Sequence, residues 1–138
     1  MRTAVDSNVI AALWSREPTA SRMATLLREA RAAGPLLVAA PVWAEFHAAP
    51  GATAEFVARF LADTGIERDL GLDEDVWRHA AAAYAAYAER RRAVADGEPK
   101  RLLVDLLVGA HAIARADRLL TLDAQRYRRA VPGLRIEP

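Results

Sequence analysis

The chain has 138 residues, enough for one domain with a sizeable core, and its 53% hydrophobic and 27% charged residues are ordinary for a globular protein. It contains no cysteine, which excludes disulfides and thiolate metal sites. Its apolar runs are too short to cross a bilayer, and its N-terminal region does not resemble a secretory signal, so we expect a cytoplasmic protein without a membrane partner.

The formal net charge of +1 is unevenly distributed along the chain. Residues 1–75 carry seven arginines and eleven acidic residues, whereas residues 76–138 carry twelve basic and seven acidic residues. Basic side chains outside an acidic pocket suit an enzyme that acts on a polyanion, because they attract the substrate. Solvated helix faces explain the same asymmetry equally well, so the charge pattern alone does not decide between them.

The first half of the chain alternates short apolar runs with amphipathic segments. Residues 2–6 predict a buried strand, and Ser7 and Asn8 are typical caps for a helix over residues 9–16. The segments that follow predict a helix at 20–33, a strand at 36–40, a helix from Pro41 to the break at Pro50-Gly51, a helix at 53–63, and a weak strand or loop at 65–70.

The second half begins with a long helix from Asp73 to Arg92, which has acids in its first turn and arginines in its last, as the helix dipole favours. The remaining segments predict a loop at 95–101, a helix at 103–116, a strand at 118–122, a helix at 124–130 and a strand at 134–136. Strands that alternate with helices indicate one α/β domain, with a central and mainly parallel sheet flanked by helices.

Four acidic residues stand at the ends of predicted strands or at the starts of helices. Asp6 and Asp123 follow strands, Glu45 lies early in the helix after the second strand, and Asp105 opens an apolar helix. Ligand sites in parallel sheets lie beyond the carboxyl ends of the strands, so we expect these side chains to converge. Converging carboxylates need a cation, and oxygen ligands suit Mg²⁺ or Mn²⁺. The set favours metal-assisted hydrolysis of a phosphodiester.

Each acid also has a purely structural interpretation. An aspartate after a strand is often a helix cap, as Asp6 or Asp123 would be, and Glu45 taken alone could be a surface acid. Asp105 is harder to explain in this way, because it is surrounded by apolar residues in the sequence. It is the four together that favour a site.

Histidine and aromatic side chains outside these positions are expected to pack or to face solvent. The histidines His47, His79 and His111 are not at metal-ligand spacing. We expect Trp77 to be a core residue or a dimer anchor, and Tyr84 to pack in the core.

Four short motifs occur in a fixed order along the chain: VDSNVI at 5–10, PVWAEF at 41–46, LVDLLVGAHA at 103–112 and RLLTLD at 118–123. Together they resemble the PIN-domain ribonucleases, and among them the VapC-type toxins of prokaryotic toxin–antitoxin pairs. The resemblance covers nearly the whole chain and implies a PIN-like fold over residues 1–138. It also implies an Mg²⁺-dependent endoribonuclease in which Mn²⁺ can substitute, an RNA substrate, a homodimer and a cognate antitoxin.

The resemblance assigns roles to individual residues. Asp6 and Asp105 would be the primary Mg²⁺ ligands, and Glu45 and Asp123 would support them. Ser7, Asn8 and Thr121 would hold the carboxylates in place through hydrogen bonds. Relatives often carry a basic residue where this chain has Leu122, which bears on substrate contact and not on metal binding. Apart from the resemblance, we rank Arg126, Arg128 and Arg129 first for substrate contact, because they come just after Asp123 in the sequence.

Two other interpretations remain open from the residues alone. A phosphate-transfer domain also places an aspartate after its first strand, but the dehalogenase type expects a second aspartate where Asn8 stands. The receiver type expects an acidic pair and a late lysine, whereas the single lysine of this chain, Lys100, falls in a predicted loop. A non-catalytic adaptor would keep the fold to bind protein or RNA. We would expect it to have lost one or more of the four acids, all of which are present.

Overall fold

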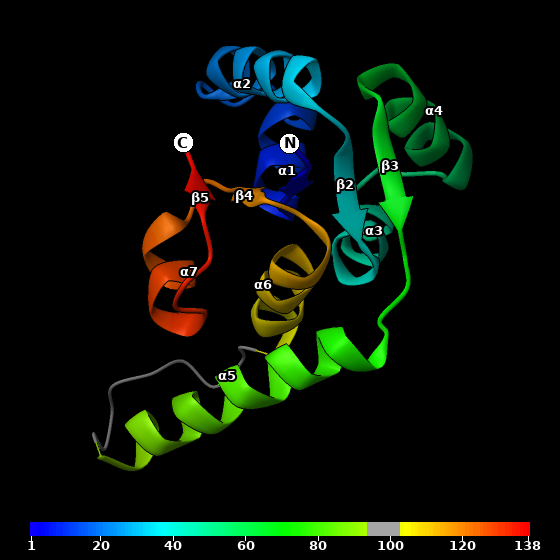
Figure 1. Cartoon of the computed structure of the whole chain (residues 1–138). Helices are drawn as coiled ribbons and strands as arrows, with labels where there is room; N and C mark the ends of the chain where they lie inside the picture. Colours follow the sequence, from blue (N-terminus) through cyan, green and yellow to red (C-terminus); the bar gives the residue numbers. More distant parts are fainter. Residues whose placement is uncertain (94–102) are drawn as a thin grey trace.

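The computed structural model describes residues 1–93 and 103–138, so the predicted loop at 95–101, with Lys100, lies outside the described residues. The described residues form one parallel sheet with the strand order β3-β2-β1-β4-β5 (Figure 1). Its strands are β1 (Thr3–Val5), β2 (Leu36–Ala39), β3 (Ile66–Asp69), β4 (Arg118–Leu120) and β5 (Ile136–Glu137). The predicted α/β class with a central parallel sheet is therefore confirmed.

Helices connect the strands and cover the sheet (Figure 1). They are α1 (Ser7–Trp14), α2 (Ala20–Ala33), α3 (Ala40–His47), α4 (Ala54–Thr64), α5 (Glu74–Ala93), α6 (Leu103–Arg115) and α7 (Ala124–Ala130). Helix α6 contacts the central strands on one side and the long helix α5 on the other, and α5 runs along the outside of the molecule. No helix within the described residues is both long and apolar enough to cross a membrane.

The central strands form because they are apolar enough to be buried on both faces, as parallel sheets require. All residues of β1 and β2 are buried, whereas only Ile66 of β3 is buried, because β3 lies at the edge. The segment predicted as a weak strand or loop is thus a strand, and it pairs with β2 from Ile66 to Asp69. This segment is too polar to be recognised as a strand without its neighbour.

Several predicted boundaries were wrong by one to three residues, and two of them matter for function. The strand predicted at 2–6 ends at Val5, and α1 begins at Ser7 because Asp6 is the cap residue, with the Ser7 N–H donating to its carboxylate at 2.8 Å. The strand predicted at 118–122 ends at Leu120, so Asp123 does not end a strand. It caps α7 instead, because its carboxylate accepts from the Arg126 N–H at 3.4 Å.

The last strand is also displaced from its predicted position at 134–136. It covers Ile136 and Glu137, because these residues pair with Leu119 and Leu120 of β4. A strand of two residues carries little periodicity of its own, so the pairing with β4 decides where it lies.

The core holds α6 firmly between the sheet and its neighbouring helices. The main cluster surrounds the central strands, a second joins α6 to α7 through Leu106 and Val131, and a third joins α6 to α5 through Leu107 and Val76. Gly109 permits the close approach of α7, since a Cβ there would lie 2.6 Å from a Val131 methyl. The helix that carries Asp105 is therefore fixed on three sides. Trp77 and Tyr84 on α5 are exposed by 46% and 43%, so the expectation that Tyr84 packs in the core was wrong.

His111 is buried on α6, where its Nε2 lies 3.0 Å from the Asp69 carboxylate at the end of β3. Burial lowers the pKa of His111 below its usual value of 6.5, and the positive charge of Arg115 lowers it further, while Asp69 opposes the shift. The folded protein thus holds His111 neutral at a pH where the unfolded chain already binds a proton.

This depressed pKa predicts a loss of stability on acidification. The free energy of unfolding receives the full contribution of neutral His111 above pH 6.5 and loses it as the pH falls through the folded pKa. We expect the free energy of unfolding, measured with urea, to fall more between pH 7 and pH 5 for the wild type than for His111→Gln, whose residue 111 cannot titrate. Parallel pH profiles for the two proteins would contradict the prediction.

Candidate acidic active site

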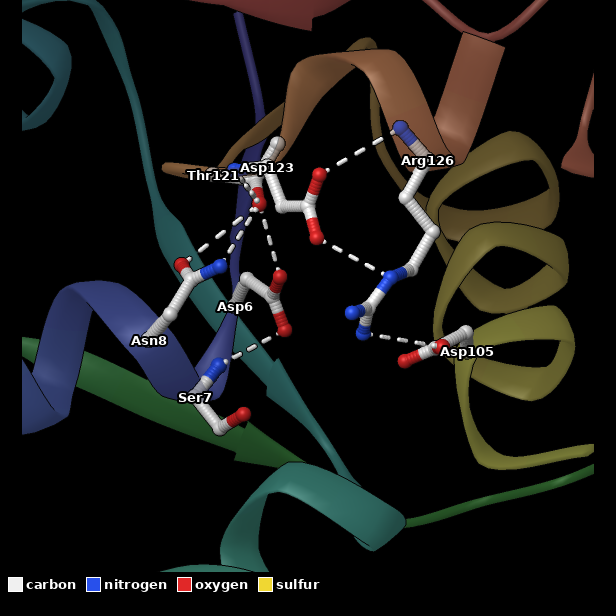
Figure 2. A network of polar contacts seen from close by, with 7 residues as sticks. All are labelled: Asp6, Ser7, Asn8, Asp105, Thr121, Asp123 and Arg126. Carbon is white, nitrogen blue, oxygen red and sulfur yellow. Dashed lines mark hydrogen bonds and ion pairs between the residues drawn. The ribbon is translucent and has the colours of Figure 1, made fainter. Parts of the chain in front are cut away.

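The predicted acids meet beyond the carboxyl ends of two neighbouring strands. Strands β1 and β4 are parallel and pair Val5 with Leu120, so the residues that follow each strand emerge side by side. Asp6 and Asp123 lie in these segments, and Asp105 faces them from the first turn of α6 (Figure 2). Chain segments more than a hundred residues apart thus contribute to one acidic pocket.

Asp6 is the most buried member of the pocket, with 5% of its surface exposed, and each of its carboxylate oxygens accepts a hydrogen bond. The Ser7 N–H donates to Oδ1 at 2.8 Å, and the Thr121 hydroxyl donates to Oδ2 at 2.7 Å (Figure 2). Such bonds satisfy a carboxylate that has lost its hydration. Ser7 therefore supports Asp6 through its backbone N–H.

Thr121 is the hub of the hydrogen bonds that join β1, α1 and the segment after β4. Besides donating to Asp6, its hydroxyl accepts from the Asn8 amide and from the Asp123 N–H, both at 3.1 Å. The Asn8 carbonyl oxygen in turn accepts from the Leu122 N–H at 3.0 Å. Asn8 and Thr121 thus lie where they can fix two of the acids, as their predicted supporting role requires.

Arg126 lies among the acids, which the sequence did not predict. Its Nη1 is 3.3 Å from Oδ2 of Asp105, and its Nε is 2.9 Å from Oδ2 of Asp123 (Figure 2). Arg128 and Arg129 are exposed elsewhere on α7. Of the three arginines predicted to contact substrate, Arg126 is thus the one that contacts the carboxylates directly.

The pKa of Asp105 reflects its burial and the charges that surround it. Burial raises this pKa above its usual value, the charge and hydrogen bond of Arg126 lower it, and the negative charges of Asp6 and Glu45 raise it further. Glu45, on α3, is thus close enough for its charge to act on Asp105. Arg126 thus offsets the charges of the two acids at Asp105, and burial is the main reason that the pKa stays raised.

Tyr127 is a neighbour of the site to which the sequence assigned no role. It is 1% exposed on α7, and burial, followed by the charges of Asp6 and Asp105, raises the pKa of its hydroxyl. The phenol therefore stays protonated beside Asp6 and can act as a donor. Its position directly after Arg126 was the available signal, but the direction of a side chain from a short helix depends on how that helix packs.

The chemistry of this pocket suits a divalent cation, but its side chains are not arranged to bind one. The donors are all carboxylate oxygens, and a cation would stabilise the ionised form of Asp105, which burial disfavours. Yet within residues 1–93 and 103–138, no three acidic or histidine side chains are already grouped as metal ligands. Arg126 takes up oxygens of both Asp105 and Asp123, so side chains must move before these acids can bind a metal.

An apolar cavity of about 250 Å³ adjoins the acids between α1 and α3. Ser7, Asn8 and Glu45 line its polar end, and Trp14 and Phe46 contribute to its apolar part. Glu45 and Asn8 thus belong both to the candidate site and to a recess that contains aromatic side chains.

A family model described as the PIN domain matches residues 3–131 of the chain. The chain belongs to the PIN-domain family. The match spans all four acids of this PIN domain, together with the Thr121 hub and Arg126. No curated protein sequence matches it at a significant level.

Three solved structures share the fold of this PIN domain over almost its whole length. VapBC2 from Rickettsia felis, bound to a DNA fragment from its promoter, has a TM-score of 0.76 and 16% identity, and the match covers 99% of this chain and 98% of that chain. VapBC-1 from nontypeable Haemophilus influenzae has a TM-score of 0.66 and 20% identity, with 99% and 97% covered. DNA-bound VapBC from Salmonella typhimurium has a TM-score of 0.65 and 16% identity, again with 99% and 97% covered. At these identities the likeness is one of fold.

Proposed function

We propose that this PIN domain is a VapC-type toxin, a cytoplasmic endoribonuclease that hydrolyses RNA phosphodiester bonds with Mg²⁺, for which Mn²⁺ can substitute. The observation that carries the proposal is the pocket of Asp6, Asp105 and Asp123, with the charge of Glu45 acting on it, at the carboxyl edge of the sheet. The VapBC structures that share the fold support a toxin role and a cognate antitoxin as partner.

The residues divide the work of binding a cation. Asp6 and Asp105 would hold it, with Glu45 and Asp123 in support, and the hydroxyl of Thr121 keeps Asp6 oriented. When bound, a divalent cation neutralises charge on the phosphodiester and promotes attack by water. Exposed Arg128 on α7 adds positive potential near the pocket, which attracts the RNA backbone. Single-stranded or looped RNA suits such a site best, because its bases are accessible.

Cleavage of total RNA by the purified protein tests this function. We expect discrete fragments with Mg²⁺ or Mn²⁺, none with EDTA, and none from Asp6→Asn in any buffer. Binding of the same RNA by Asp6→Asn should persist, because the arginines are unchanged. If the wild type binds RNA without cutting it under any metal condition, and Asp6→Asn binds equally well, the protein is the non-catalytic adaptor instead.

The proposed homodimer has a suitable surface on the outer face of α5. Trp77, Ala81 and Tyr84 follow each other at helical spacing on this face, and the two aromatic residues are exposed. Glu74 and Arg92 are eighteen residues apart, which is five helical turns, so they lie at opposite ends of the same face. Two copies of α5 packed antiparallel would place each glutamate beside the arginine of the other copy, with the small alanine allowing close approach.

Charge placed at the centre of this face should weaken the dimer. We expect Tyr84→Asp to raise the dimer dissociation constant by about tenfold or more, because a buried, unpaired carboxylate is costly. Light scattering during size-exclusion chromatography over a concentration series measures the change. Leu70→Asp is the control, since Leu70 is 39% exposed outside α5. Equal dissociation constants for the two variants would exclude α5 as the interface, and a monomeric wild type would exclude the dimer.

A further inference from the structure

Arg126 occupies both oxygens of Asp123 and one oxygen of Asp105. Its backbone N–H donates to Oδ1 of Asp123 at 3.4 Å, its Nε lies 2.9 Å from Oδ2 of the same carboxylate, and its Nη1 reaches Oδ2 of Asp105 at 3.3 Å. The guanidinium is thus shared between two carboxylates on different elements and does not form a two-pronged pair with one of them. It joins the start of α7 to the first turn of α6 (Figure 2).

We propose that Arg126 is the internal counter-cation of the acidic pocket, which bridges Asp105 and Asp123 while the pocket is free of metal and is displaced from them when a divalent cation binds. This inference rests on the proposed function, because it concerns the same carboxylates. According to this proposal, Arg126 competes with the metal for the carboxylates. In the metal-free protein, Arg126 thus has a role other than substrate contact.

The charges of the pocket explain why such a cation is needed. Asp6 is fixed by two hydrogen bonds and cannot turn away, and the charges of Asp6 and Glu45 act on Asp105. A positive group between the carboxylates lowers their mutual repulsion. A second cation in the same space would be repelled by the guanidinium, so metal and Arg126 exclude each other at these oxygens.

The exposure of Arg126 explains why the bridge can open. Its side chain is 52% exposed, compared with 21% for Asp105, and ion pairs in contact with water are weak. The guanidinium can therefore turn into solvent while the backbone N–H of Arg126 still donates to Asp123, which caps α7. Once released at the edge of the pocket, it is free to meet an RNA phosphate, so metal binding would make this arginine available to the substrate.

Manganese binding measured by electron paramagnetic resonance tests the competition without any need for catalysis. We expect Arg126→Gln to bind Mn²⁺ about five- to thirty-fold more tightly than the wild type, as the loss of two partly exposed ion pairs implies. Arg59→Gln removes the same charge from an exposed position on α4, which carries none of the four acids, and should bind Mn²⁺ within about twofold of the wild type.

The side chain can also be followed directly in the wild-type protein, which avoids any effect of mutation on folding. In ¹⁵N-labelled protein, the Arg126 Nε–H signal, assigned by its absence from Arg126→Gln, should exchange slowly without metal and move to the position of free arginines as Mg²⁺ is added. Arginines away from the pocket should not respond to Mg²⁺.

Three results would overturn the inference. They are equal or weaker Mn²⁺ binding by Arg126→Gln, an Nε–H signal that Mg²⁺ leaves unchanged, and an absence of Mn²⁺ binding in all three proteins. RNA cleavage by the wild type in the same buffer is a separate measurement. If cleavage is metal-dependent while either of the first two results holds, the proposed function stands and only the role of Arg126 is wrong.

Discussion

Asp105→Asn is expected to lower RNA cleavage by about 10²- to 10⁴-fold while the protein stays folded. The amide keeps the size of the side chain but removes the negative charge that would hold a divalent cation. Since burial and the charges of Asp6 and Glu45 already raise the pKa of Asp105, its ionised form is disfavoured in the folded protein. The neutral variant should therefore lose little stability at neutral pH, even though the ion pair with Arg126 is removed.

The comparison is made with single-turnover cleavage rates and with urea unfolding of the same samples. Asp63→Asn is a matched control, because Asp63 is an exposed residue near the end of α4 and should give wild-type rates. Cleavage by Asp105→Asn at the wild-type rate would remove Asp105 from the site. A variant that fails to unfold cooperatively would show instead that Asp105 is needed for the fold, against the argument from its pKa.

Thr121→Val should produce the second-largest effect, with a loss of roughly 1–3 kcal/mol in the free energy of unfolding and a fall of about 10- to 100-fold in cleavage. The hydroxyl of Thr121 uses its one proton toward Asp6 and both lone pairs toward Asn8 and Asp123. Valine has the same shape without the hydroxyl. It would leave the carboxylate of Asp6, which is 5% exposed, with one donor fewer.

Thr121→Ser separates the hydroxyl from packing. Serine keeps all three hydrogen bonds and loses only a methyl group, so it should cleave RNA at close to the wild-type rate, with a loss of about 1 kcal/mol in stability. Urea unfolding and cleavage rates measured side by side check both variants. If the valine and serine variants behave alike, the hydrogen bonds of Thr121 contribute nothing and the account of how Asp6 is held is wrong.

The two predictions test different properties of the same site, namely the charge of Asp105 and the orientation of the carboxylates. Asp105 is placed by α6, which the core fixes on three sides, so its variant reports on charge. Thr121 is placed by the end of β4 and contacts residues of β1 and α1, so its variant reports on how the carboxylates are oriented. A pocket in which both variants lose activity, but only the second loses stability, would match the structure.

The sequence by itself determined the class of the fold and predicted that acids gather at the carboxyl edge of the sheet. Short, fully apolar runs such as Leu36–Ala39 can be satisfied only by burial on both faces, which a parallel sheet covered by helices provides. Acids directly after such runs are confined to the carboxyl edge of the sheet. Asp6 and Asp123 could therefore be assigned to the same edge of the sheet from the sequence, although not to neighbouring positions on it.

Tertiary structure alone decided which oxygens are free and which are already occupied. Thr121 and Asp6 are 115 positions apart, and their contact depends on β4 lying next to β1, an order that local periodicity does not encode. The position of Arg126 depends on how α7 packs against α6, which involves Val131 and Gly109 and not the residues near Asp123 in the sequence. Sequence patterns determine which face of a helix or strand is buried, whereas long-range packing determines which groups the end of a flexible charged side chain contacts.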